Sequence, residues 1–146
     1  MAKIVKWLLV VFILMQFVPL GHEHTNAPVT KEPAWDSPQT RTLFVNACYD
    51  CHSNQTIWRW YAYVAPVSWL IARDVNQGRR HLNFSQWDHP QRHAGDVAIQ
   101  VNRGDMPPWF YIPLHPASKL SAADKQQLIA GAEKSLGPQK AAGERE

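Results

Sequence analysis

The stretch Cys48-Tyr49-Asp50-Cys51-His52 is the strongest motif of the chain. Two cysteines that are separated by two residues and followed at once by a histidine form the attachment signature of c-type haem. The spacing has a geometric reason, because two thiols three positions apart on a helical turn can each add to one vinyl group of a porphyrin. The next residue then offers its imidazole to the iron from one face. The motif therefore predicts one covalently attached haem, haem c.

Closely spaced cysteines also occur in redox disulfides and in zinc sites. A redox C-x-x-C pair needs no histidine directly after it, and it usually lies at a strand-to-helix junction of a βαβ fold, which this sequence does not indicate. A zinc site needs a fourth ligand at finger-like spacing, and the sequence offers none. The chain has only 2 cysteines, so haem attachment would use both of them.

The sixth coordination position of the iron decides between electron transfer and ligand binding. Outside the first 21 residues Met106 is the only methionine, and it lies in the run GDMPP at 104–108. A thioether on a proline-stiffened loop is a soft ligand that favours reduced iron, although a lone methionine is often core filler. Met106 is therefore the first candidate for the sixth ligand, and His115 is the second. Further alternatives are an open position and three other histidines, namely His81, His89 and His93.

The first 21 residues are typical of an export signal or a membrane anchor. Lys3 and Lys6 precede an apolar run from Trp7 to Leu20, and a positive start before an apolar run is the pattern of such segments. A helix of this run spans roughly 21 Å, which is short of the hydrocarbon core of about 30 Å. No clean small-x-small cleavage site follows. We expect residues 1–21 to be an uncleaved anchor or a cleaved signal peptide, with the rest on the periplasmic side of the bacterial inner membrane.

Length and charge narrow the functional class. The 146 residues suit one compact domain. The formal net charge is +3, but it falls to +1 without residues 1–21, because 13 basic residues then face 12 acidic ones. A nucleic-acid binder needs a concentrated basic face, so this class is excluded. Beyond the leader we expect a flexible linker at 22–36, a haem-binding domain at 37–137 and a disordered tail at 138–146.

Capping residues and apolar spacing predict helices throughout the domain, and no window shows the alternation of a strand. Each helix begins at a capping residue or a proline, and most end at a glycine. We expect them from Ser37 into Cys48, from Pro66 to near Gly78, from Asp88 to Gly104 and from Ser121 to Gly137. The segment 105–119 holds four prolines and is expected to be an irregular loop. The predicted fold class is all-α, a cytochrome c-like small helical domain with long loops around the haem.

Aromatic and basic residues are candidates for further haem contacts. The chain has 7 tryptophans, and we interpret most of them as walls that exclude water from the macrocycle. These are Trp58, Trp60, Trp69, Trp87 and Trp109. Three arginines could pair with haem propionates, form a docking patch or make a solvated face. These are Arg73, Arg79 and Arg80.

Several runs resemble the bacterial haem-binding-domain family, whose members are small exported or membrane-tethered proteins with one C-x-x-C-H motif. The runs are CYDCHSNQT at 48–56, WRWY at 58–61, APVSWL at 65–70, GRRHLNFS at 78–85, GDMP at 104–107 and LHP at 114–116. The likeness covers roughly residues 38–136, with Arg59 at a position where members commonly carry proline. The resemblance implies that Cys48 and Cys51 attach the haem and that His52 is the proximal ligand. The layout is also similar to that of single-haem cytochromes c.

These observations predict a monohaem c-type cytochrome that passes single electrons between transient redox partners. The alternative is a haem-based sensor or small-ligand binder with a displaceable or open sixth position. A peroxidase-like enzyme with open iron is a third possibility. No constellation of catalytic acid, base or nucleophile is visible in the sequence, so an electron carrier is favoured over a catalyst.

Overall fold

A computed structural model describes residues 1–21 and 24–137 of the chain. The α-helices are α1 (Ala2–Met15), α2 (Pro38–Ala47), α3 (Tyr49–His52), α4 (Val67–His81), α5 (Val97–Arg103) and α6 (Ala122–Leu136). The single-turn 3₁₀ helices are η1 (Trp60–Tyr63), η2 (Ala94–Asp96), η3 (Ile112–Leu114) and η4 (Pro116–Ser118). The described part of the chain contains no strand, only an isolated bridge between Lys31 and Gln86. The predicted all-α class is thus confirmed.

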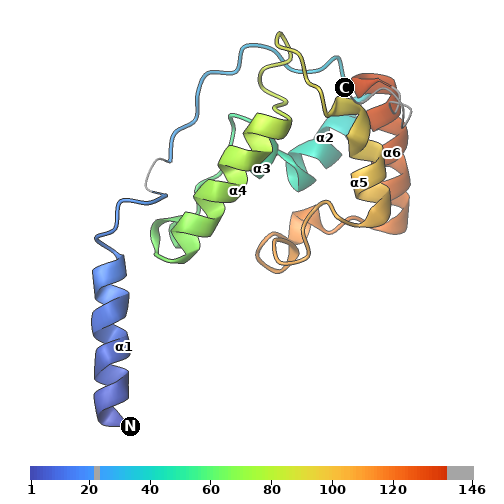
Figure 1. The fold of residues 1–146 in the computed structure, drawn as a ribbon. Coiled ribbons are helices and arrows are strands. Elements are labelled where there is room, and N and C mark those ends of the chain that lie inside the picture. The colour runs from blue at the N-terminus through green and yellow to red at the C-terminus, as the bar shows by residue number, and fades with distance from the viewer. Residues whose placement is uncertain (22–23, 138–146) are drawn as a thin grey trace.

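Helix α1 extends away from the other helices (Figure 1), and none of its residues is buried. Gln16 follows it and binds the backbone of Ala65, donating from Nε2 to the carbonyl at 3.2 Å and accepting from the amide at 3.0 Å. None of the described helices has both the length and the apolar character needed to cross a membrane. The leader, linker and domain boundaries stay predictions, and the tail predicted at 138–146 lies outside the described residues.

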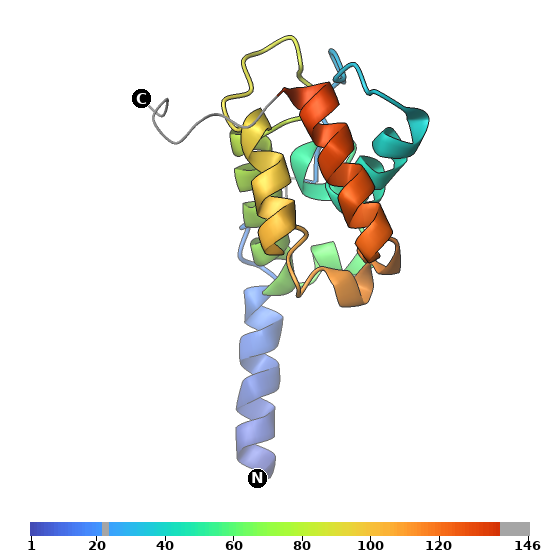
Figure 2. The ribbon, with the colours of Figure 1, turned by 90° about the vertical axis from the view of Figure 1, so that its right-hand side faces the viewer.

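The haem motif lies where helices α3 and α4 meet helices α2, α5 and α6. Helix α5 packs beside α6, α6 contacts α2, and α3 packs on α4 (Figure 2). The core between them is built on aromatic and aliphatic side chains, of which Phe44 and Leu128 are fully buried. The Phe44 ring meets Phe84 edge-on at 5.2 Å between centroids. Burying each of these side chains contributes about 1.5–3 kcal/mol.

Two predicted helix starts have the expected capping contacts. The Ser37 hydroxyl accepts a hydrogen bond from the backbone amide of Thr40 at 3.1 Å, at the start of α2. Ser121 and Asp124 form a complete capping box at the start of α6. Gly104 ends α5 with a φ of 82°, in the left-handed region that favours glycine.

Two other helix boundaries differ from the prediction. Helix α4 continues past Gly78 to His81, and Gly78 serves a close approach instead, because a Cβ there would lie 2.4 Å from the carbonyl oxygen of Cys51. Among the apolar residues of α4, Val75 is buried whereas Val67 and Leu70 are exposed.

The helix that we expected to start at Asp88 starts later in the chain. Helical structure begins with η2 at Ala94 and continues as α5 from Val97. The side chain of Gln91 is the reason, because it pairs with loop backbone. Its Oε1 accepts from the Asn83 amide at 2.9 Å, and its Nε2 donates to the Gln86 carbonyl at 2.9 Å. The loop at 105–119 is irregular as predicted, apart from η3 and η4.

Candidate functional site

The two cysteines of the motif lie on one helical turn. Cys48 lies between α2 and α3, as the C-cap of one and the N-cap of the other, and its carbonyl accepts from the amides of Cys51 at 3.2 Å and His52 at 2.9 Å. Both thiols are free and partly buried. Burial raises the pKa of Cys48 and of Cys51 to about 12. Reactive redox dithiols have a depressed pKa instead, so this pair lacks the electrostatics of a thiol–disulfide catalyst.

His52 is held as a neutral imidazole. Its Nδ1 lies 3.1 Å from the carbonyl oxygen of Leu82, the C-cap residue that follows α4. A carbonyl only accepts, so Nδ1 carries the ring proton and Nε2 keeps its lone pair. Burial lowers the pKa of His52, and the carbonyls of Leu82 and Gly78 oppose this in part. A metal-ligating histidine needs this neutral form and this kind of outer hydrogen bond.

Arg79 stabilises the segment that follows the motif, residues 53–56, through hydrogen bonds. Its guanidinium donates to the Ser53 carbonyl at 2.8 Å, the Thr56 hydroxyl at 2.9 Å and the Asn26 side chain at 2.7 Å. Arg79 is therefore occupied in holding the linker and the segment after α3. Arg73 and Arg80, the other two arginines considered for propionate contacts, lie exposed on α4.

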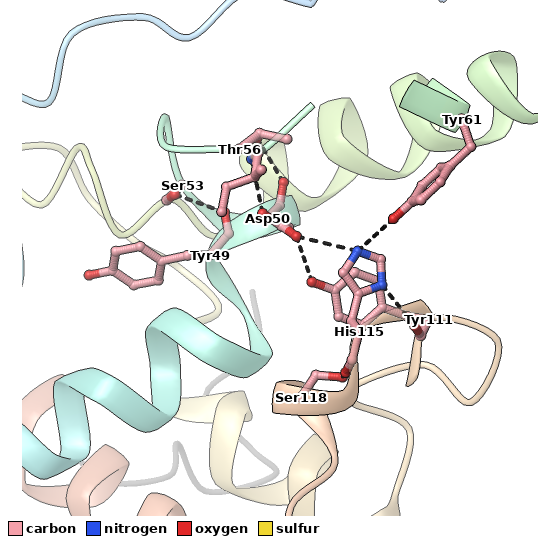
Figure 3. A network of polar contacts seen from close by, with 9 residues as sticks. Tyr49, Asp50, Ser53, Thr56, Tyr61, Tyr111, His115 and Ser118 are labelled. Carbon is pink, nitrogen blue, oxygen red and sulfur yellow. Dashed lines mark hydrogen bonds and ion pairs between the residues drawn. The ribbon is translucent and has the colours of Figure 1, made fainter. Parts of the chain in front are cut away.

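Asp50, between the two cysteines, anchors a polar network that sequence reasoning missed (Figure 3). Its Oδ2 accepts from the Tyr111 hydroxyl at 2.7 Å, and its Oδ1 accepts from the Ile57 amide at 3.0 Å. Burial raises the pKa of Tyr111, and the Asp50 carboxylate raises it further, so the phenol keeps the proton that it donates. Tyr49 points away from this network. No sequence signal links residues 50 and 111.

His115, the second candidate for the sixth ligand, belongs to the same network. Its ring stacks on Tyr111 at 3.6 Å between centroids, and its Nε2 lies 3.6 Å from Asp50 Oδ2. Its Nδ1 lies 2.8 Å from the Tyr111 carbonyl and so carries the proton. The hydroxyl of Tyr61 therefore donates to Nε2 at 2.9 Å. Both ring nitrogens already have partners.

Met106 lies on the loop after α5 with 38% of its surface exposed. Its backbone amide donates to the Gln100 carbonyl at 3.3 Å. The alternative histidines lie at the surface, where His81 and His93 meet edge-on and His89 lies beside an aspartate.

The five tryptophans have different surroundings. Trp87 stacks on Phe84 at the core, and Trp58 packs against His24. Trp60 and Trp109 are 77% and 80% exposed. Trp69 and Trp87 are partly buried, and the role of the five tryptophans as haem walls stays a prediction.

The donor set fits haem, because a neutral imidazole with a free Nε2 follows two free thiols on one helix. The fold and this site define a small helical haem-binding protein. A model of the family described as "Haem-binding domain" matches residues 10–134, so the chain belongs to that family, as its motifs indicated. Neither the curated proteins nor the solved structures yielded a match.

Proposed function

We propose that this haem-binding protein is a monohaem c-type cytochrome that carries single electrons outside the cytoplasmic membrane. The observation that carries the proposal is the hydrogen bond of 3.1 Å from His52 Nδ1 to the Leu82 carbonyl, next to the free thiols of Cys48 and Cys51. When bound, the haem supplies an iron couple that takes up and releases one electron.

The chain's own residues prepare each attachment point. Cys48 and Cys51 would hold the haem through thioether bonds, which would form by addition of each S–H across a vinyl double bond and so would need no oxidant. His52 presents Nε2, while the Leu82 carbonyl fixes the tautomer and the ring orientation. Gly78 lets α3 and α4 lie close together, which keeps this carbonyl within reach of the ring.

Met106 is our proposed sixth ligand. Recruiting His115 would require breaking the bond of Tyr61 to Nε2 and turning a ring that is stacked on Tyr111. The Met106 side chain makes no hydrogen bond within the described part of the chain and is partly exposed, and Pro107 and Pro108 stiffen its loop. Methionine ligation raises the potential and suits electron transfer.

A haem-based sensor or small-ligand binder is the second candidate. The observation in its favour is that Met106 is 38% exposed on an irregular loop, from which a weak thioether ligand could be displaced. Either function would be carried out on the periplasmic side, with the chain anchored or soluble there. An electron carrier would meet its redox partners through small, transient interfaces.

The proposal is tested on the full chain, matured in a bacterial host that is competent for cytochrome assembly. Intact mass should equal the polypeptide plus one haem, and the pigment should survive denaturation, whereas a Cys48→Ala, Cys51→Ala variant should lose it. Bare polypeptide would overturn the proposal. The methionine-to-iron charge-transfer band of the ferric protein, with slow carbon monoxide binding after reduction, supports the carrier. Absence of that band with immediate binding supports the sensor.

A further inference from the structure

We infer that Asp50, Tyr61, Tyr111 and His115 form a clasp that fixes the loop 105–119 to the haem motif and so holds Met106 in place. These four are positioning residues, and the inference rests on the proposed role of Met106. The clasp joins three segments, because Asp50 lies on α3, Tyr61 on η1, and Tyr111 and His115 on the loop (Figure 3).

Loop 105–119 packs against α2 through η4, but few hydrogen bonds tie it to the rest of the domain. Within the described part of the chain, every backbone hydrogen bond donated from 107–119 ends inside the loop, as in Tyr111 to Pro108 and Ser118 to His115. Among the described residues, the hydrogen bonds that link this stretch to the rest of the domain involve two of its side chains, Tyr111 and His115. These are the bond of Tyr111 to Asp50 at 2.7 Å and that of Tyr61 to His115 at 2.9 Å.

The clasp is shielded from water, and each of its hydrogen bonds pairs a hydroxyl donor with a carboxylate or imidazole acceptor. The side chains of His115 and Asp50 are only 10% and 16% exposed. Hydrogen bonds to a carboxylate are shorter and stronger than neutral ones, and low exposure strengthens them. The stacked rings of Tyr111 and His115 add contact along the loop. Losing either bond therefore removes a main attachment of the loop.

Met106 lies between two fixed points. On one side its amide is bonded to the Gln100 carbonyl of α5. On the other side Tyr111 is clasped to α3, and Pro107 and Pro108 in between have restricted backbone freedom. Restraint at both ends lowers the entropy that Met106 loses on binding and keeps its thioether from drifting away.

Tyr111→Phe in the haem-loaded protein is the test, because it removes one hydroxyl and keeps the ring. We expect amide hydrogen exchange in 105–119 and the rate of carbon monoxide binding to reduced protein each to rise on the order of tenfold. Tyr61→Phe should act in the same direction. Glu32→Gln is the matched control, since its carboxylate also has short bonds, at 2.7 Å to Arg41, but lies outside the clasp. It should change neither readout.

The outcomes separate the clasp from the proposed function. If both phenylalanine variants lower stability but leave loop exchange and carbon monoxide binding unchanged, the residues are merely structural and the inference is wrong. If the unmutated protein lacks the methionine band, the role of Met106 fails, while faster loop exchange in Tyr111→Phe still supports the clasp. Asp50→Asn is a further variant, but Asp50 lies inside the attachment motif, so the inference is judged on Tyr61 and Tyr111.

Discussion

Gly78→Ala is the substitution for which the structure and helix propensity make opposite predictions. In the interior of a helix, alanine is ordinarily favoured over glycine by about 1 kcal/mol. At Gly78, however, the added Cβ would lie 2.4 Å from the carbonyl oxygen and 2.9 Å from the carbonyl carbon of Cys51. Ordinary contact begins near 3.4 Å, so helices α3 and α4 must separate by about 1 Å. The obstacle is backbone, which cannot rotate away as a flexible side chain would.

Overpacking of this kind costs about 1–3 kcal/mol or more. Because the obstacle is backbone, we expect a cost of about 2–3 kcal/mol, which after the gain in propensity leaves a net loss of about 1–2 kcal/mol in the free energy of unfolding. The assay is denaturant unfolding of the haem-loaded protein, followed by far-ultraviolet circular dichroism and by haem absorbance. Gln77→Ala, at the exposed neighbouring position on α4, is the control and should stay within about 0.5 kcal/mol of the unmutated protein. A Gly78→Ala protein that is as stable or more stable would refute the close approach of the two helices.

Three further substitutions test the site and the fold. Met106→Ala should abolish the methionine charge-transfer band of the ferric protein, and an unchanged spectrum would reject Met106 as ligand. Ser121→Ala should lower the free energy of unfolding by about 1 kcal/mol, measured in denaturant, because it removes the N-cap of α6; no loss would mean that the cap contributes nothing. Hydrogen bonds from Arg41 lower the pKa of Glu32, and burial opposes this effect. The pair therefore stabilises the fold fully at pH values above the ordinary carboxyl pKa. This stabilisation is lost as the pH falls through the lowered pKa of Glu32. Glu32→Gln should therefore flatten the loss of stability on acidification, and an unchanged pH profile would contradict the ion pair.

Local patterns predicted most helix starts because their causes are local. The hydroxyls of Ser37 and Ser121 bond amides only three residues ahead, so spacing alone reveals them. The end of α4 was missed for the opposite reason. Gly78 resembles a helix stop in sequence, but what requires glycine there is the carbonyl of Cys51, a contact that no window around residue 78 contains.

The amino-acid sequence by itself determined the haem motif, the all-α class and the family, because C-x-x-C-H chemistry and helix caps are set by neighbours along the chain. Only the tertiary structure decided which partners complete the site. The Leu82 carbonyl that orients His52 lies 30 residues away, and Tyr111, which bonds Asp50, lies 61 residues away. The tertiary structure also gives both ring nitrogens of His115 a hydrogen-bond partner, Tyr61 for Nε2 and the Tyr111 carbonyl for Nδ1. The position of His115 in the sequence does not indicate either contact. The physical reason is that such contacts depend on how α3, α4 and the loop 105–119 pack, and hydrogen bonds form only at the distances this packing sets.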